Sequence, residues 1–148
     1  MWDATEVMGG AIGEGLKAEG VDFKMLNLKL NHRSDVMTEV LDSRAIILGS
    51  PTINNGIMPA MADIICYMKG LRPTGKIGAA FGSYGWSGEA VKLMTEALRD
   101  MNIDIAGEGI RVKFTPRKED LDKCVELGRQ IGRSVMAMDS ESKASVKA

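Results

Sequence analysis

Apolar residues occur along the chain with two different spacings, which predict strands and helices in alternation. Short continuous or alternating apolar runs predict strands at 21–27, 44–49, 76–81 and 103–114. Apolar residues three or four positions apart predict helices at 5–19, 34–41, 59–69, 88–101 and from Pro116 onward. Strands and helices that alternate in this way form right-handed βαβ units. The pattern therefore predicts an α/β fold with a parallel sheet and helices on both of its faces.

The positions of serine and glycine indicate where these helices and strands begin, break or pack closely. Ser34 is expected to cap the second helix, and Gly107-Glu108-Gly109 is expected to interrupt the last strand. Gly9, Gly10 and Gly13 lie inside the first helix, where glycine weakens an isolated helix. We therefore expect this helix to pack closely against the sheet.

The length and composition of the chain indicate one domain. The 148 residues are enough for a single core, which we assign to 1–136, and the small, polar and charged residues of 137–148 predict a flexible tail. The formal net charge is -1 and there is no basic block, so neither nucleic acid nor a membrane surface is an expected partner. Because no apolar run could span a bilayer and no signal-peptide pattern opens the chain, we expect a cytoplasmic protein.

The residues that commonly bind metals are few. His32 is the only histidine, which excludes a site with several histidines, and its place in a turn before a helix favours a structural role. Cys66 and Cys124 are 58 positions apart, without a CxxC pair, and we expect both to be buried free thiols. The eleven methionines fall mostly at helical positions among aliphatic residues, which favours the core. No metal site is expected, although the histidine count does not exclude a site made of carboxylates alone.

Two loops of unusual composition follow predicted strands. Residues 50–59 are rich in hydroxyl, amide, proline and glycine, and 82–88 combine two aromatic residues with three glycines. A third stretch, 2–5, precedes the first helix, where free N–H groups and the helix dipole favour a phosphate. Ligands of parallel α/β sheets bind beyond the carboxyl ends of the strands, where all three stretches lie. The three stretches together supply a phosphate site, amide groups and aromatic rings. This combination predicts a pocket for flavin mononucleotide (FMN).

The residues expected to contact this cofactor are Trp2, Asp3, Ala4, Thr5, Ser50, Pro51, Thr52, Ile53, Asn54, Asn55, Gly56, Ser83, Tyr84, Gly85, Trp86, Ser87 and Gly88. Either Tyr84 or Trp86 is expected to stack on the flavin ring. Thr5 could donate its hydroxyl to the phosphate or act as a plain helix cap. The Asn55–Gly56 peptide is the candidate for the group near flavin N5, where glycine would allow a peptide flip.

Three segments resemble the flavodoxin-like domain of flavodiiron proteins, also called A-type flavoproteins. They are Gly49-Ser50-Pro51-Thr52-Ile53-Asn54-Asn55-Gly56, Gly70-Leu71-Arg72-Pro73 and Phe81-Gly82-Ser83-Tyr84-Gly85-Trp86-Ser87-Gly88-Glu89. The resemblance implies a flavodoxin-like three-layer sandwich that binds FMN and passes electrons to a di-iron site, which reduces oxygen or nitric oxide. It implies a rubredoxin-like donor, and it assigns 2–5 to the phosphate loop and 50–56 and 83–88 to the two sides of the ring.

The chain departs from this family in two ways. The family's di-iron centre lies in a separate domain rich in histidine, and a chain with His32 alone cannot contain it. Family members also have an apolar strand before the phosphate loop, which in the sheet order 2-1-3-4-5 lies between the strands expected at 21–27 and 44–49. We therefore expect either that the first strands rearrange to close the gap or that another chain fills it.

The expected function is electron transfer through bound FMN, with no side chain as a catalytic group. Whether the isolated chain counts as an enzyme stays open, as does the formation of a homo-oligomer. An NAD(P)H:quinone reductase on the same fold and a non-catalytic fragment with an empty pocket are alternatives. A receiver-type regulatory module is disfavoured, because Gly49-Ser50 stands where that fold needs an aspartate.

Overall fold

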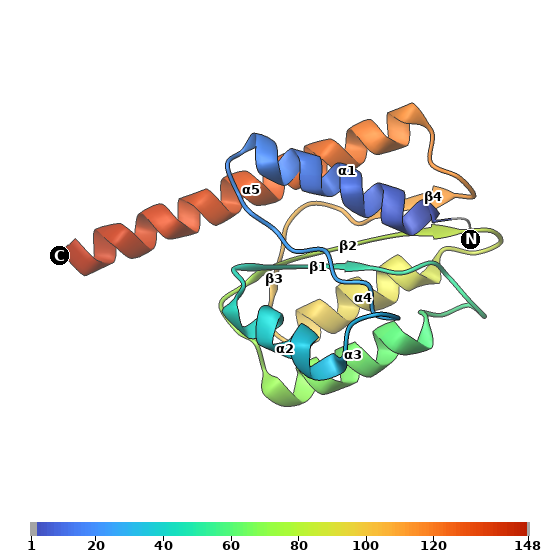
Figure 1. Ribbon diagram of the computed structural model, residues 1–148, viewed down its shortest axis with the longest axis horizontal. Helices are drawn as coiled ribbons and strands as arrows, with labels where there is room; N and C mark the ends of the chain where they lie inside the picture. The colour runs from blue at the N-terminus through green and yellow to red at the C-terminus, as the bar shows by residue number, and fades with distance from the viewer. Residues whose placement is uncertain (1–2, 148) are drawn as a thin grey trace.

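The computed structural model describes residues 3–147 and contains five helices and four strands within them (Figure 1). In chain order these elements are α1 (Ala4–Ala18), α2 (Arg33–Asp42), β1 (Ala45–Gly49), α3 (Pro59–Leu71), β2 (Ile77–Tyr84), α4 (Glu89–Asp100), β3 (Asp104–Ile105), β4 (Ile110–Lys113) and α5 (Lys118–Lys147). Every helix expected from the apolar spacing is present. Pro59 is the first residue of α3, as its fixed φ and missing N–H favour.

The sheet is parallel and is built around β2. On one side, β2 pairs with β1 over the whole length of β1. On the other side, β3 pairs with the start of β2 and β4 pairs with its end. The chain between β3 and β4 turns at Gly107, whose φ of 70° lies in the left-handed region. The expected interruption of the last strand is therefore confirmed.

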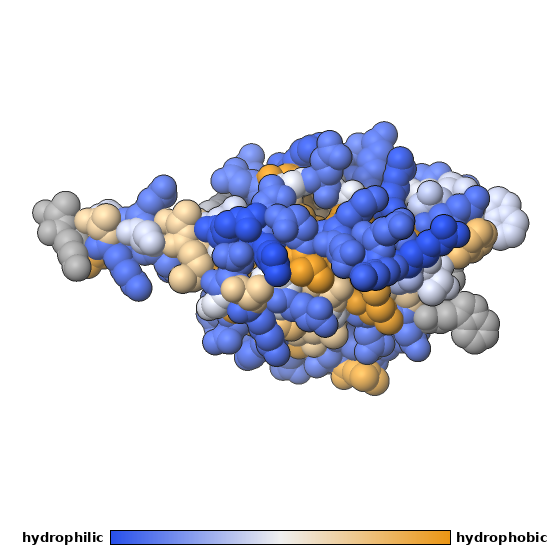
Figure 2. Space-filling model, turned by 90° about the horizontal axis from the view of Figure 1, so that it is seen from above, coloured by the Kyte–Doolittle hydropathy of each residue, from blue (hydrophilic) through white to orange (hydrophobic). Residues whose placement is uncertain are grey.

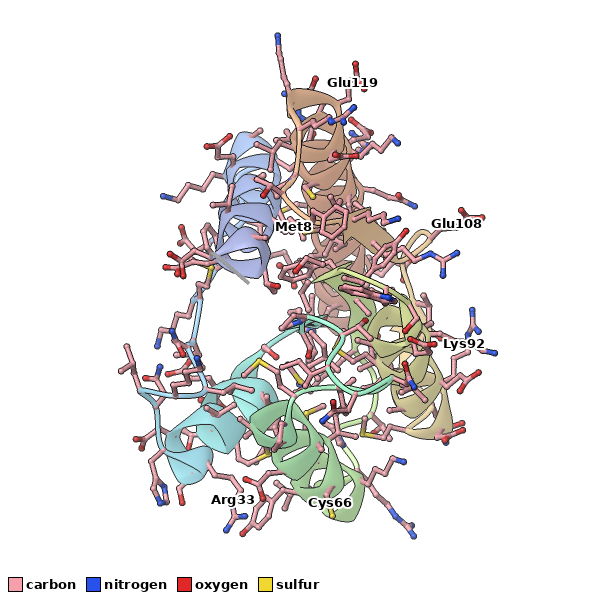
Figure 3. The ribbon with its side chains drawn as sticks, turned by 90° about the vertical axis from the view of Figure 1, so that its right-hand side faces the viewer. Met8, Arg33, Cys66, Lys92, Glu108 and Glu119 are labelled. Carbon is pink, nitrogen blue, oxygen red and sulfur yellow. The ribbon has the colours of Figure 1, made fainter. Side chains whose placement is uncertain are left out.

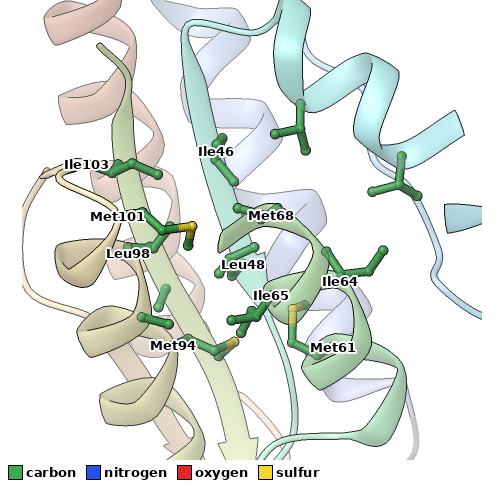
Figure 4. Close-up of a cluster of buried hydrophobic side chains, with 14 of the residues drawn as sticks. Ile46, Leu48, Met61, Ile64, Ile65, Met68, Met94, Leu98, Met101 and Ile103 are labelled. Carbon is green, nitrogen blue, oxygen red and sulfur yellow. The ribbon is translucent and has the colours of Figure 1, made fainter. Parts of the chain in front are cut away.

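Helices cover both faces of the sheet, which confirms the three-layer arrangement. Figures 1 and 3 show α1 and α5 on one face and α2, α3 and α4 on the other. Between the sheet and the second group of helices lies a cluster of buried aliphatic and methionine side chains (Figure 4). A second cluster lies beneath α1 and α5. Buried methionines occur in both, as expected: Met8, Met37, Met61, Met68, Met94 and Met101.

Residues 21–27 do not form the expected strand. They have no regular secondary structure, and no backbone hydrogen bond joins Asp22 through Leu26 to another part of the described chain. Val21 and Phe23 pack against the cluster beneath α1 and α5, and Leu26 packs against the opposite cluster. The apolar alternation therefore reflects burial, and a strand is absent because no neighbouring strand is there to pair with it. Among residues 3–147 the first strands do not rearrange to close the gap.

The last helix continues through most of the residues expected to form a tail. Residues 137–147 belong to α5. Met138 packs against the core beneath α1 and α5, and the Asp139 carboxylate lies 3.4 Å from Arg44. These contacts hold the part of α5 that follows residue 136 against the rest of the domain. Figure 2 shows the hydrophilic outer surface of the domain and the end of α5 projecting from it. The flexibility of this segment stays a prediction.

Helices α1 and α5 approach each other closely through glycines. A Cβ atom on Gly15 would collide with the carbonyl oxygen of Val125, and one on Gly128 would collide with the carbonyl oxygen of Ile12. Gly9 faces the ring of Phe81 on β2. The close packing predicted from the glycines of the first helix is confirmed for Gly9, but Gly10 has open space around its Cβ position.

Polar side chains hold both ends of α2. The prediction that Ser34 caps this helix is wrong, because the capping residue is His32. The Nδ1 atom of His32 accepts a hydrogen bond from the Ser34 N–H at 3.2 Å. At the other end, Lys76 is only 8% exposed and its Nζ donates to the carbonyl oxygens of Leu41 and Ser43. Burial lowers the pKa of Lys76, and these carbonyl groups offset part of that cost.

The two cysteines differ in environment. Cys124 is fully buried on α5, and burial raises the pKa of its thiol to about 11. Cys66 is exposed, contrary to expectation. The core-facing stripe of α3 consists of Met61, Ile64, Ile65 and Met68, and Cys66 lies outside that stripe.

The glycine contact between α1 and α5 can be tested with a matched pair of variants. Gly15→Ala should lower the free energy of unfolding by about 1–3 kcal/mol, because the added methyl group collides with backbone. Gly10→Ala should raise it by about 0.5–1 kcal/mol, because alanine favours the helix and nothing obstructs its methyl group. Urea unfolding measures both. Equal effects of the two substitutions would contradict the packing described for α1 and α5.

Thiol labelling should separate the two cysteines. We expect one thiol per native chain to react with a disulfide reagent at pH 8, and two in denaturant, because only Cys66 is exposed. Cys66→Ser should leave no rapidly reacting thiol in the native protein. The raised pKa of Cys124 stabilises the fold below pH 9, and this contribution should disappear as the pH rises towards 11. Rapid labelling of native Cys66→Ser would show that Cys124 is accessible.

Candidate functional site

The carboxyl ends of the strands meet at one edge of the sheet, beside the start of α1. Figure 3 views the molecule from this end. Loops leave β1, β2 and β4 here and lead into α3, α4 and α5. A hydrogen bond of 3.2 Å between Thr5 Oγ1 and Ser83 Oγ joins the first turn of α1 to the end of β2. All three stretches expected to bind the cofactor therefore reach this edge, apart from Trp2, which lies outside the described residues.

The loop after β1 is held in shape by its own hydrogen bonds. Ser50 is 1% exposed, and its Oγ donates to the carbonyl oxygen of Pro51 and accepts from the Met58 N–H at 3.0 Å. Further along, Ile53 and Gly56 exchange two backbone hydrogen bonds. Asn54 and Asn55 between them have φ of 49° and 59°, as a tight type I′ turn requires, and asparagine tolerates this region. Two amide side chains are thus placed at the tip of the loop.

Hydrogen bonds also tie this loop to the chain around the end of β2. The Thr52 N–H donates to the Ser83 carbonyl oxygen at 2.8 Å, and the Thr52 Oγ1 accepts from the Ala90 N–H at 3.2 Å. Ser87 Oγ donates to Asn55 Oδ1 at 3.0 Å. Because these bonds join the loops at several points, they fix the position of the loops relative to each other.

A cavity of about 400 Å³ opens between the loops. Seven of the expected residues line it: Ala4, Thr52, Asn54, Asn55, Gly85, Trp86 and Ser87. Its aromatic surfaces are Trp86, which is 96% exposed, and Phe114, which is 60% exposed. Residues 3–147 bring no three histidine, cysteine, aspartate or glutamate side chains together as a metal site. The cavity thus has the aromatic and amide groups that suit a flat polar ring.

Phe114 and Thr115 were missed by the sequence analysis. They follow β4 at the carboxyl edge, so the rule that placed the other two loops at the site would have found them. The Phe114 N–H donates to the Tyr84 carbonyl oxygen at 2.8 Å, which continues the pairing of β4 with β2. Phe114 has a φ of 62°, a conformation that is unusual for a bulky residue and that turns the chain beyond the strand.

The other expected residues support the cavity without lining it. Ser50, Pro51, Ile53 and Gly56 form the framework of the first loop, as their hydrogen bonds show. The Tyr84 ring packs against Gly88, where a Cβ atom would lie 3.3 Å from the ring. Asp3 precedes α1 with a φ of 53° and makes no side-chain cap hydrogen bond.

The start of α1 offers unpaired backbone donors next to hydroxyl groups. The Asp3 carbonyl oxygen accepts the first intrahelical bond, from the Val7 N–H at 2.9 Å. The N–H groups of Ala4, Thr5 and Glu6 precede that bond and have no partner within the helix. Together with the Thr5 and Ser83 hydroxyls and the positive end of the helix dipole, these donors suit a phosphate.

A family model described as flavodoxin matches residues 1–128. The chain belongs to the flavodoxin family. It is 45% identical to a nitric oxide reductase of Moorella thermoacetica over 136 residues, which are 91% of this chain and 34% of that protein. The structure of rubredoxin oxygen:oxidoreductase from Desulfovibrio gigas superimposes with a TM-score of 0.90 and 42% identity, over 93% of this chain and 34% of that one.

A flavodoxin of archaeal origin shares the fold along nearly its whole length. Its structure superimposes with a TM-score of 0.83 and 33% identity, over 92% of this chain and 93% of the flavodoxin. The first two relatives are flavodiiron proteins, of which the chain spans about a third, so the resemblance to their flavodoxin-like part is confirmed. Membership of the family also confirms the flavodoxin-like fold and FMN as the cofactor. No helix within residues 3–147 has the length and apolarity to cross a membrane.

Proposed function

We propose that the chain binds FMN in the cavity at the carboxyl edge and transfers electrons through it. The observation that carries this proposal is the cavity itself, where Asn54, Asn55, Trp86 and Phe114 surround a space next to the start of α1. FMN, when bound, supplies a ring that accepts and releases one or two electrons. The protein binds and orients this ring, and no side chain acts as nucleophile, acid or base.

The phosphate of FMN is assigned to the start of α1. Residues 2–5 form the proposed phosphate loop, with the N–H groups of Ala4 and Thr5 and the hydroxyls of Thr5 and Ser83 as donors. Thr5 is the second residue of α1, which places its side chain inside the first turn and favours the phosphate over a simple capping role.

Trp86 is the proposed stacking partner of the flavin ring. Its side chain lines the cavity and is almost fully exposed, whereas Tyr84 packs against Gly88. Covering an exposed indole with a flat ring removes a large apolar area from water. Phe114, on the third loop, is proposed to contact the ring as well. The structure thus favours Trp86 where the sequence left Trp86 and Tyr84 as alternatives.

The first loop is proposed to contact the polar edge of the ring. Asn54 and Asn55 carry amide groups that can donate to or accept from ring heteroatoms. The Asn55–Gly56 peptide remains the candidate near flavin N5. Its N–H donates to the Ile53 carbonyl oxygen at 2.9 Å, so a flip of this peptide would have to break the bond that closes the turn.

The names of the relatives suggest partners for the chain. We propose a rubredoxin-like protein as the electron donor and a di-iron domain as the acceptor, because the relatives are a rubredoxin oxygen:oxidoreductase and a nitric oxide reductase. We also propose a cytoplasmic location. Reduction of quinones by NAD(P)H is the alternative activity, and the choice of electron donor separates the two.

Removal of the Trp86 side chain should weaken FMN binding about tenfold to a hundredfold, because a stacked aromatic ring contributes about 1–3 kcal/mol. Titration of the apoprotein into FMN, followed by quenching of flavin fluorescence, measures the dissociation constant. The matched control is Tyr67→Ala, which removes a partly exposed aromatic ring on α3 and should leave the affinity unchanged. An unchanged affinity in Trp86→Ala would remove Trp86 from the site.

The FMN-loaded chain should be reduced by a reduced rubredoxin much faster than by NADH. The proposed partner is a rubredoxin-like protein, and the aromatic and amide groups that line the cavity are assigned to the flavin ring. Stopped-flow loss of flavin absorbance under anaerobic conditions compares the two donors. Rapid reduction by NADH, followed by turnover with a quinone, would favour the reductase over the electron-transfer module.

A further inference from the structure

Asn55 lies at the tip of the loop after β1, and glycine follows it in the chain. Of the five asparagines only Asn55 precedes a glycine, and the others precede leucine, histidine, asparagine or isoleucine. The backbone nitrogen of the following residue can attack the side-chain amide of an asparagine, and a Cβ atom on that residue hinders the approach. Asn55 is therefore the asparagine whose amide is least hindered from this attack.

Exposure and backbone conformation do not set Asn55 apart. Asn54 and Asn102 are exposed as well, and their φ of 49° and 58° resemble the 59° of Asn55. The residue after Asn102 is the buried Ile103, and the residue after Asn54 is Asn55 itself. Asn54 and Asn102 are thus matched controls within the same chain.

A hydrogen bond from Ser87 also distinguishes Asn55. Ser87 Oγ donates to Asn55 Oδ1 at 3.0 Å. When a nitrogen attacks the carbon of an amide, negative charge develops on the amide oxygen, and a donor that is already in place stabilises this charge. Among the described residues, no hydroxyl donates to the side-chain amide of another asparagine. The fold therefore places both a nucleophile and a donor for the developing charge beside the Asn55 amide.

The turn that contains Asn55 restrains the attack. The Gly56 N–H donates to the Ile53 carbonyl oxygen at 2.9 Å, and this bond has to open before the nitrogen can reach Asn55 Cγ. Loops open locally at a small cost in free energy. The rate of attack thus depends on how often the turn opens, and a ligand that holds the turn closed slows it.

We propose that Asn55 of the flavin-free chain deamidates spontaneously, with the Gly56 nitrogen as nucleophile and the Ser87 hydroxyl as donor to Oδ1. The Gly56 nitrogen forms a bond to Asn55 Cγ, and the Cγ–Nδ2 bond breaks. The proton lost from the Gly56 nitrogen leaves with Nδ2 as ammonia. The cyclic imide that results takes up water and opens to aspartate or isoaspartate, so water is the only co-reactant.

Deamidation changes the cavity in which FMN is proposed to bind. It replaces an amide that lines the cavity with a carboxylate, which carries a negative charge and cannot donate. FMN has a negatively charged phosphate, so like charges would share the cavity. A chain without FMN should thus lose affinity for it, and bound FMN should protect Asn55. These effects of FMN rest on the proposed function, whereas deamidation of the flavin-free chain does not.

Tandem mass spectrometry of peptides from the full chain tests the proposal. The flavin-free protein is incubated at pH 8, and the exchange of amide for carboxylate is followed at each asparagine. Asn55 should react about tenfold or more faster than Asn54 and Asn102, because the attack on their amides is hindered. Equal rates at the three positions, or an Asn55 that keeps its amide, would overturn the proposal.

Two substitutions separate the roles of Gly56 and Ser87. A Cβ atom on Gly56 would lie 3.7 Å from its nearest neighbour, the Ile53 carbonyl oxygen, so alanine fits. Gly56→Ala should slow deamidation about tenfold, because the methyl group hinders the attack. Ser87→Ala should slow it about threefold to tenfold, because the donor to Oδ1 is lost. Ser134→Ala, on α5, is the control and should leave the rate unchanged.

Each variant has a result that contradicts it. An unchanged rate in Gly56→Ala would exclude the Gly56 nitrogen as the nucleophile. An unchanged or higher rate in Ser87→Ala would show that the Ser87 hydroxyl does not promote the reaction, which would overturn its proposed role.

FMN provides a further comparison. At an FMN concentration about ten times the dissociation constant, deamidation should slow about tenfold, because only the free fraction of the chain reacts. Quenching of flavin fluorescence in the same samples measures binding, so a failure to bind FMN is recognised separately. Bound FMN without slower deamidation would overturn the protection of Asn55.

The variant Asn55→Asp carries the charge of one product. It should bind FMN about tenfold more weakly than the original chain, because of the added negative charge and the lost donor. The same fluorescence titration measures this affinity. An unchanged dissociation constant would overturn the link between deamidation and FMN binding.

Discussion

The structure depends on the central strand β2, which is hydrogen-bonded on both sides and buried on both faces. It is the only strand within residues 3–147 that pairs with all the others. Its residues contact helices from both layers, through Phe81 on the α1 side and Ala80 on the other. A strand buried in this way has to be apolar along its length. Its end carries one loop of the site, and the loops after β1 and β4 are hydrogen-bonded to it. The position of the cavity thus follows from the position of β2.

Close backbone contact at the end of β2 links the fold to the site. A Cβ atom on Gly82 would collide with the carbonyl oxygen of Ser50, so only glycine allows the loop after β1 to approach β2 this closely. Ser83, the next residue, bonds to Thr52 through its carbonyl oxygen and to Thr5 through its hydroxyl. One short segment thus holds the first loop and the start of α1 in place. The polar groups proposed to bind the phosphate and the ring are therefore ordered by contacts that are part of the fold.

The carboxyl edge of the sheet and the outer edge of β1 differ in their hydrogen bonding. The loops at the carboxyl edge are joined by hydrogen bonds, and aromatic and amide side chains line the cavity between them. Beyond β1, in contrast, the backbone groups of alternate residues have no partners among the described residues.

The sequence by itself determined the order of the elements, the parallel sheet and the two main loops of the site. Helical and strand spacing are local properties, and glycine, asparagine and aromatic residues after a buried strand indicate a ligand loop wherever the strand lies. The tertiary structure decided the rest. Residues 21–27 have the pattern of a strand but lack a partner, and Cys66 lies on the solvent side of α3.

The same limit explains the site residues that the sequence could not assign. Trp86 and Tyr84 are two positions apart and equally suited to stack on a ring, yet one lines the cavity and the other packs on Gly88. Phe114 enters the cavity because β4 pairs with β2, a contact between residues about 30 positions apart. Pairing and burial of this kind depend on contacts that are distant in the chain. Local patterns therefore predict which residues can bind, and the assembled sheet decides which of them line the cavity.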